Sequence, residues 1–253
     1  MICDAHVHMG WYARLGHETP FYYSPRRIAG VLARCGVDRF IVSSTCAQVE
    51  GIGIADIVRE AREMKRIAGR RAHVFFWLSG RLYDEDPAMR WMDSGLFDGI
   101  KLHGGETPWL LRRRAELRRI LSAAERHGWP VMIHSGADDG SRPAELAAVA
   151  EAFPSVRFCF AHGRPMEEMA AVVAACPNVW TDTAYMDAED FAALPRHDWR
   201  GRLMFGTDLP VWQAHETAGL TSRCRDCIRA FAATGLAESS TEAFGRFVGD
   251  VEA

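Results

Sequence analysis

The chain has 253 residues, of which 48% are hydrophobic and 25% are charged, and its formal net charge is −3 at pH 7. This composition is typical of a globular protein and excludes a disordered chain or a coiled coil. The charge balance gives no general attraction for nucleic acid or an anionic membrane. The longest apolar run, residues 169–176, is far shorter than the roughly 20 residues that cross a bilayer.

Eight short runs of apolar, β-branched or aromatic residues alternate with amphipathic helical stretches along the chain. Strands that alternate with helices indicate βα units, an α/β fold and a parallel sheet. Eight units in this length favour a single (β/α)8 TIM barrel over residues 1–253, with an extra C-terminal helix over 239–248. The predicted strands are 2–8, 39–43, 73–78, 99–103, 130–134, 157–162, 179–182 and 202–208.

Helix boundaries and the start of the chain give further expectations. Ser24 followed by Pro25 predicts the N-terminus of a helix that ends at Gly36, and Pro143 predicts the start of another. The first predicted strand begins almost at Met1, so we expect no signal or transit segment and a cytoplasmic location.

Titratable residues stand at the C-terminal ends of most predicted strands. Because these ends open onto one face of a barrel, where active sites are built, we expect the side chains to converge there. His6 and His8 alternate along the first strand, so both point into the lumen and can share one metal ion. His134, His162 and Asp208 are further ligand candidates. Imidazole nitrogen with one carboxylate oxygen suits zinc, and also manganese or iron.

The ordered motifs DAHVH, GIKLH, VMIHSG, FAHGR, NVWTDTA and LMFGTDLP cover nearly the whole chain. This pattern resembles the amidohydrolase superfamily, in particular its small TIM-barrel metal-dependent hydrolases related to aminocarboxymuconate-semialdehyde decarboxylase. The resemblance implies that His6, His8, His134 and Asp208 bind the metal. It implies that His162 either binds a second ion or holds the attacking water.

Lys101 is one of only two lysines among 30 basic residues and shares the inward phase of its strand with His103. The strand resembles that in which dihydroorotase-like amidohydrolases carry a carboxylated lysine bridging two metals. Two readings stay open. Either Lys101 is carboxylated and His134 and His162 bind a second ion, or Lys101 is a free ammonium that binds a substrate carboxylate or pairs with Asp208.

Substrate contacts are expected from the loops that follow the strands. Aromatic residues with a few arginines suit a small organic acid or cyclic compound, because a guanidinium matches a carboxylate bidentately. The expected partner is therefore a small molecule such as a carboxylate, with a homo-oligomer also open. The candidate substrate contacts are His103, Arg14, Arg164, Trp11 and Trp212.

The favoured interpretation is a metal-dependent hydrolase that acts on an amide, lactone or ester bond with a metal-activated water. Asp208 and His162 are its predicted catalytic residues, with Asp208 taking a proton from the water and returning it to the leaving group. The alternatives are a decarboxylase on the same scaffold and a catalytically silent metal-binding barrel.

Overall fold

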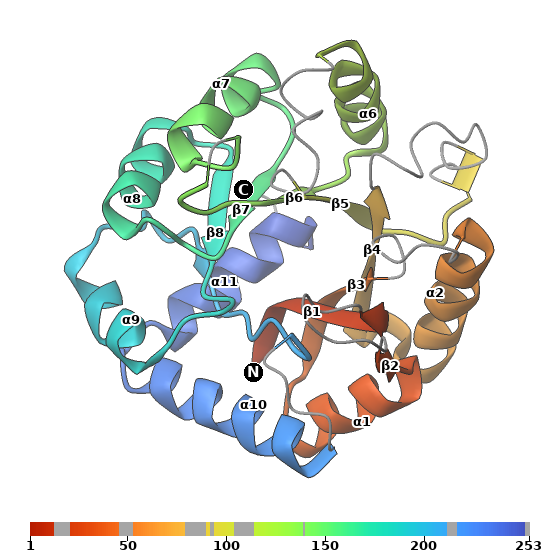
Figure 1. Ribbon diagram of the computed structural model, residues 1–253. Helices are drawn as coiled ribbons and strands as arrows, with labels where there is room; N and C mark the ends of the chain where they lie inside the picture. The colour runs from red at the N-terminus through yellow and green to blue at the C-terminus, as the bar shows by residue number, and fades with distance from the viewer. Residues whose placement is uncertain are drawn as a thin grey trace.

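The computed structural model describes residues 1–12, 21–45, 53–78, 90–91, 94–103, 114–138, 140–211 and 217–250. Their strands form one curled, mostly parallel sheet with the order β2-β1-β3-β4-β5-β6-β7-β8-β9 (Figure 1). The strands are β1 (Cys3–Tyr12), β2 (Phe21–Tyr23), β3 (Arg39–Ser44), β4 (Ala72–Leu78), β5 (Gly99–His103), β6 (Val131–His134), β7 (Phe158–Ala161), β8 (Val179–Asp182) and β9 (Leu203–Met204).

Helices surround the sheet on its outer side, and one further helix, α11, lies across the centre of the view in Figure 1. Residues between the sheet and the outer helices form the larger apolar core. Among the described residues, no helix combines the length and hydropathy that a membrane crossing requires. The helices are α1 (Pro25–Arg34), α2 (Ile54–Ala68), α6 (Arg114–His127), α7 (Pro143–Ala152), α8 (Met166–Ala175), α9 (Ala188–Ala193), α10 (Thr217–Ala232) and α11 (Ala237–Val248), with 3-10 turns η2 (Gly69–Arg71) and η3 (Leu194–Arg196).

The expected alternation of strands and helices is confirmed, with two differences. β2 was not predicted, because three aromatic residues are too few to show an alternating pattern; it pairs antiparallel with the end of β1. β9 covers only Leu203–Met204 of the predicted 202–208. The following segment hydrogen-bonds to β1 instead: Ala5 N donates to Phe205 O at 2.7 Å and His8 N to Leu209 O at 2.6 Å.

Local sequence signals explain the helix ends. Ser24 caps α1, because its side chain accepts a hydrogen bond from Arg27 N at 3.2 Å, and Pro25 occupies the first turn. Gly36 follows this helix with a φ of 75°, a conformation that glycine adopts without steric cost. The predicted C-terminal helix is α11, which begins two residues earlier than expected.

A bulge in β1 places the site residues. The register of β1 against β3 shifts between Asp4 and Val7, so one extra residue enters this part of the strand. Ala5 packs in a smaller apolar cluster inside the curled sheet, whereas Val7 packs in the larger core between the sheet and the outer helices. His6 and His8 flank Val7 and therefore both point into the lumen, as the alternation predicted.

The C-terminal helix α11 packs against the smaller apolar cluster inside the curled sheet. Phe244 and Phe247 of α11 are buried there with Phe75 of β4 and Trp180 of β8. The Phe247 ring lies 5.9 Å from the Trp180 ring and 6.3 Å from the Phe75 ring, measured between centroids. This aromatic layer lies beneath the histidine cluster, so α11 supports the floor of the site.

We expect Phe247→Ala to lower the free energy of unfolding by about 3–5 kcal/mol, because it removes a fully buried aromatic side chain and leaves a cavity. Urea denaturation followed by circular dichroism measures this loss. Glu242→Ala on the exposed face of the same helix is the control, with an expected change within about 0.5 kcal/mol. A loss for Phe247→Ala no larger than that for Glu242→Ala would show that α11 does not support the sheet.

Candidate metal centre and active site

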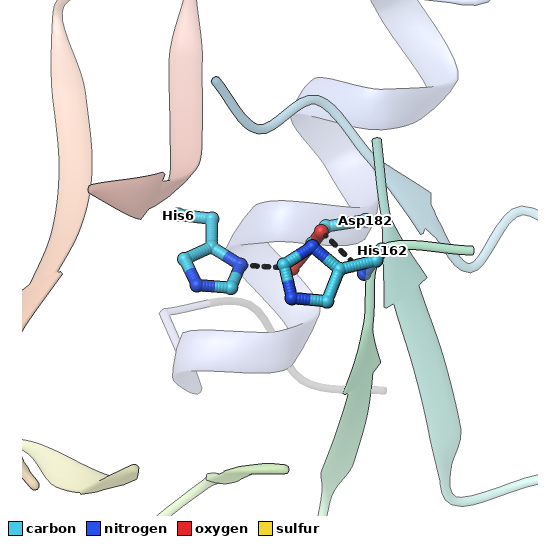
Figure 2. Close-up of side chains that lie close together, drawn as sticks. All are labelled: His6, His162 and Asp182. Atoms are coloured by element: carbon cyan, nitrogen blue, oxygen red, sulfur yellow. Dashed lines mark hydrogen bonds and ion pairs between the residues drawn. The ribbon is translucent and has the colours of Figure 1, made fainter. Parts of the chain in front are cut away.

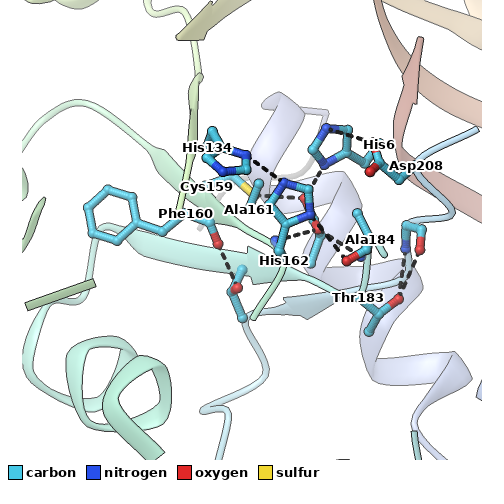
Figure 3. Close-up of polar contacts among 12 residues, drawn as sticks. His6, His134, Cys159, Phe160, Ala161, His162, Thr183, Ala184 and Asp208 are labelled. Carbon is cyan, nitrogen blue, oxygen red and sulfur yellow. Dashed lines mark hydrogen bonds and ion pairs between the residues drawn. The ribbon is translucent and has the colours of Figure 1, made fainter. Parts of the chain in front are cut away.

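Four histidines and one aspartate meet at the C-terminal ends of the strands, as predicted. His6 and His8 lie on β1, His134 ends β6, His162 follows β7, and Asp208 follows β9. Figure 3 shows His6, His134, His162 and Asp208. All five line one cavity of about 1080 Å³. Strand ends that are distant in sequence therefore build one site.

Three ligand atoms converge at the floor of this cavity. His6 Nε2 lies 3.2 Å from His8 Nε2, and Asp208 Oδ1 lies 3.1 Å from His8 Nε2 and 3.6 Å from His6 Nε2. Tetrahedral donors at the usual zinc distances of about 2.0–2.1 Å are separated by about 3.4 Å. The metal triad, as we call His6, His8 and Asp208, therefore has the spacing that a small divalent ion requires.

His6 and His8 each contact a buried polar side chain through Nδ1, the ring nitrogen that is not part of the triad. Asp182 Oδ2 accepts a hydrogen bond from His6 Nδ1 at 3.0 Å, and His8 Nδ1 lies 3.0 Å from the Ser43 hydroxyl. A neutral imidazole that carries its proton on Nδ1 presents a lone pair on Nε2. The contact with Asp182 therefore turns the Nε2 lone pair of His6 toward the triad.

The backbone around Asp208 is constrained. Asp208 has a φ of 58°, which is uncommon for a residue with a side chain, and its N–H donates to His6 O at 2.8 Å. At Gly206, an added Cβ would lie 3.0 Å from the Cβ of His6. An alanine there would push β1 and the segment after β9 apart by a few tenths of an ångström, because the two approach each other closely.

His162 and His134 form a second pair beside the triad. His162 Nδ1 lies 3.2 Å from Ala184 O, and its Nε2 lies 2.9 Å from His134 Nδ1. A carbonyl oxygen only accepts hydrogen bonds, so His162 Nδ1 carries the proton and Nε2 presents a lone pair. His6, His162 and Asp182 also form a group whose ligand atoms lie within 4.8 Å of one another, whereas His134 belongs to neither such group.

Burial keeps the imidazoles of His8, His103, His134 and His162 neutral. It lowers the pKa of His8 and of His162 to about 4 and that of His103 to about 3, and it holds the pKa of His134 well below its usual value of 6.5. Burial alone would raise the pKa of Asp208, but the hydrogen bond with His8 and the nearby histidines lower it to about 2. Neutral imidazoles and an ionised carboxylate are the forms that bind metal.

Lys101, Trp77 and His103 form one wall of the cavity. Lys101 is 1% exposed, and its Nζ lies 5.4 Å from the centroid of the Trp77 ring. The His103 ring stacks between those of Trp77 and His134, with centroid separations of 5.9 Å and 4.0 Å. The predicted inward phase of Lys101 and His103 is confirmed.

Only some of the expected substrate contacts lie at the cavity in the structure. Arg164 lines the cavity, and its guanidinium lies 5.4 Å from the centroid of the Tyr185 ring. Trp11 packs against Tyr22, with ring centroids 5.1 Å apart, and is not among the described residues that line the cavity. Arg14 and Trp212 lie outside the described residues.

Sequence reasoning missed several cavity residues. Trp77 occupies the inward phase near the end of β4, so the rule that found the histidines would have found it if aromatic side chains had been included. Alternation along the strand leaves the orientation of Asp182 open, and the structure turns it toward His6. His197 lies in a loop, where a solvated side chain is expected, but it is half-buried and lines the cavity. The other lining residues not predicted include Thr45, Asp138, Glu167, Asp190 and Arg196.

Comparisons with known proteins agree with this architecture. The sequence profile of a family described as amidohydrolase matches residues 3–220. No curated protein matches the chain. A probable 2-pyrone-4,6-dicarboxylic acid hydrolase from Acinetobacter baumannii, solved with citric acid bound, is 12% identical, with a TM-score of 0.68 over 98% of this chain and 99% of that chain.

Two further solved structures have the same fold. An amidohydrolase from Burkholderia multivorans with bound zinc is 15% identical, with a TM-score of 0.65 over 98% of this chain and 99% of that chain. The IDCase of Metarhizium anisopliae, solved in its apo form, is 13% identical, with a TM-score of 0.62 over 98% and 97% of the two chains. At these identities the similarity concerns the fold alone.

Proposed function

The chain belongs to the amidohydrolase family, and from that premise we propose that it is a metal-dependent hydrolase acting on an amide, lactone or ester bond of a small organic substrate. The observation that carries the proposal is the metal triad: three buried donor atoms within 3.6 Å of one another at the floor of a large cavity. Three such atoms placed together repel one another unless a cation or proton lies between them.

The donor set fits one divalent ion, and zinc is the favoured ion, with manganese and iron as alternatives. His6, His8 and Asp208 would hold it, and His134 is the further ligand that the family resemblance implies. When bound, such an ion makes water acidic enough to supply hydroxide at neutral pH and polarises a carbonyl group. The zinc-bound Burkholderia multivorans amidohydrolase supports this choice by analogy of fold.

The residues of the chain supply proton transfer and orientation. The Asp208 carboxylate is ionised and faces the cavity, so it can accept a proton from the attacking water and return it to the leaving group. The Nε2 lone pair of His162 lies at the cavity, 2.9 Å from His134 Nδ1, and would accept a hydrogen bond from the same water in place of His134 when His134 binds the ion. Asp182 and Ser43 fix the rings of His6 and His8.

The substrate class follows from the cavity wall. Arg164 and Lys101 offer positive charge, and Trp77, His103 and Tyr185 offer flat ring faces. We propose a small carboxylate as the substrate, with Arg164 or Lys101 as its partner and His103 in contact with its body. Arg14, Trp11 and Trp212 stay predicted contacts.

A decarboxylase that acts through the same site is the second candidate, and the similarity to the IDCase of Metarhizium anisopliae favours it. A catalytically silent metal-binding barrel is the third. Purified protein loaded with Zn²⁺ should be assayed against carboxylated lactones, cyclic amides and esters, with acid release and carbon dioxide release measured separately. We expect acid release that a chelator abolishes and Zn²⁺ restores. Carbon dioxide release alone would indicate the decarboxylase, and zinc binding with neither product would indicate the silent barrel.

Whether the Lys101 amine is carboxylated determines whether the site holds one metal ion or two. We expect this amine to stay uncarboxylated, because the face of the Trp77 ring lies beside Nζ and favours a cation there. Crystals grown with bicarbonate and excess Zn²⁺ are expected to show a bare amine and about one ion per chain. Carbon-13 bicarbonate added in solution should give no carbamate signal.

The same crystals would also reveal a carboxylated Lys101. Three additional atoms on the Lys101 amine, with two ions about 3.5–4 Å apart, would show the bridged pair in which His134 and His162 bind the second ion. Lys65 is the only other lysine in the sequence, so Lys65→Met and Lys101→Met assign any carbamate signal to one residue.

We also propose that the sheet closes into a complete (β/α)8 barrel. The parallel bridge between Val7 and Leu209, and the hydrogen bonds of β1 with the segment after β9, support this closure. The cytoplasmic location and a homo-oligomer stay predictions.

A further inference from the structure

Asp182 is a completely buried carboxylate that lies between two functional histidines, as Figure 2 shows (Figure 2). Its Oδ2 accepts from His6 Nδ1 at 3.0 Å and from Cys159 Sγ at 3.5 Å. Its Oδ1 accepts from the backbone N–H groups of His162 and Ala184, both at 2.9 Å. Four donors therefore surround one carboxylate that touches no solvent.

The contact with His6 determines which ring nitrogen carries the proton. An ionised carboxylate only accepts hydrogen bonds, so His6 Nδ1 carries a proton. Its Nε2, which lies 3.2 Å from His8 Nε2, is then the nitrogen that can bind a metal ion. A carboxylate behind a histidine in this way fixes the orientation and raises the basicity of the ring as a metal ligand.

The other oxygen acts on His162 through the backbone. His162 has a φ of 76°, a strained conformation for a residue with a side chain that needs support from its surroundings. Asp182 Oδ1 holds the N–H of His162 and also that of Ala184, whose carbonyl lies 3.2 Å from His162 Nδ1. Asp182 thus supports the backbone of His162 directly and its ring through Ala184.

We propose that Asp182 is a positioning residue that sets the proton-bearing nitrogen of His6 and the direction of the His162 ring at the same time. The proposal rests on the metal-dependent function proposed above, since it assigns His6 to the metal and His162 to the attacking water. One buried side chain on β8 thereby couples the binding half of the site on β1 to the catalytic half after β7.

Asparagine has nearly the shape of aspartate, but it cannot accept hydrogen bonds both from His6 Nδ1 and from the backbone N–H groups of His162 and Ala184. If its amide oxygen faces the N–H groups of His162 and Ala184, its NH₂ faces His6 Nδ1, and His6 must move its proton to Nε2. If the amide is reversed, the NH₂ meets two backbone donors. The first arrangement reverses the hydrogen bond with His6, and the second breaks those with the two backbone N–H groups.

Asp182→Asn is therefore expected to lower the affinity for Zn²⁺ by about 10–100-fold and kcat by a similar factor, with little change in KM. A chelator competition measures the affinity, and the absorption spectrum of the Co²⁺-loaded protein reports the ligand geometry. Asp98→Asn is the matched control, because Asp98 also accepts a backbone N–H, from Val74 at 2.7 Å, away from the site. Unchanged affinity, spectrum and kcat in a folded Asp182→Asn protein would overturn the proposal. Loss of one of two bound ions would also do so, because Asp182 would then be a ligand.

A measurement on the unaltered protein covers the case in which the variant fails to fold. Long-range proton–nitrogen correlation spectra of the histidine rings, recorded with chelator present, identify which nitrogen of His6 is protonated. We expect protonation on Nδ1, and protonation on Nε2 would overturn the proposal. A wild-type protein that takes up no Zn²⁺ would contradict the proposed function, whereas this spectrum still decides the role of Asp182.

Discussion

Asp208→Asn is expected to remove both zinc binding and hydrolysis. Asp208 Oδ1 lies 3.1 Å from His8 Nε2 and 3.6 Å from His6 Nε2, so it completes the metal triad. The amide of asparagine is uncharged, which weakens the attraction for a divalent ion, and it cannot accept a proton at neutral pH. Loss of the proton acceptor alone typically costs about 10²–10⁴-fold in rate. We expect the loss of kcat/KM to reach at least this range.

Elemental analysis and the acid-release assay measure the two losses in one preparation. Asp198→Asn is the control, because the Asp198 carboxylate is largely exposed and pairs with Arg200. Its zinc content and rate should match those of the wild type. A folded Asp208→Asn protein with full zinc content and wild-type rate would remove Asp208 from the site.

His162→Ala is expected to separate catalysis from metal binding. His162 is not part of the metal triad. Its Nε2 lies at the cavity, 2.9 Å from His134 Nδ1, and is proposed to hold the attacking water in place of His134. We expect kcat to fall by about 10²–10⁴-fold while the zinc content stays near that of the wild type. Elemental analysis and steady-state kinetics on the same sample measure both quantities.

The φ of 76° at His162 calls for a second variant, because alanine is strained there. Asparagine tolerates this conformation better, so His162→Asn should fold at least as well and show the same loss of rate. His127→Ala, at the end of α6, is the histidine control outside the site. Parallel loss of zinc and activity in both His162 variants would make His162 a metal ligand.

The strand pattern predicts the site because parallel strands share one functional end. His6, His8, His134 and His162 were predicted from their place at the ends of apolar runs, and all four line the cavity. This inference needs only the alternation of side chains and the common direction of the strands. It holds despite the bulge in β1, since the extra residue precedes Val7 and leaves His6 and His8 in phase.

Pairwise contacts across the sheet were beyond this reasoning. Asp182 lies 176 residues from His6 in sequence, and only the folded sheet brings β8 beside the lumen end of β1. Strand alternation could not decide whether Asp182 faces a ligand or the exterior. Trp77 has no charge to mark it, and its stacking on His103 depends on the register of β4 against β5.

The central claim is that His6, His8 and Asp208 bind a divalent metal ion. Crystals of the purified protein soaked in Zn²⁺, with anomalous diffraction recorded at the zinc edge, test it most directly. We predict one anomalous peak among His6 Nε2, His8 Nε2 and Asp208 Oδ1, at about 2.0–2.2 Å from each. Anomalous maps without a peak at this position, from crystals soaked in excess Zn²⁺, would contradict the account.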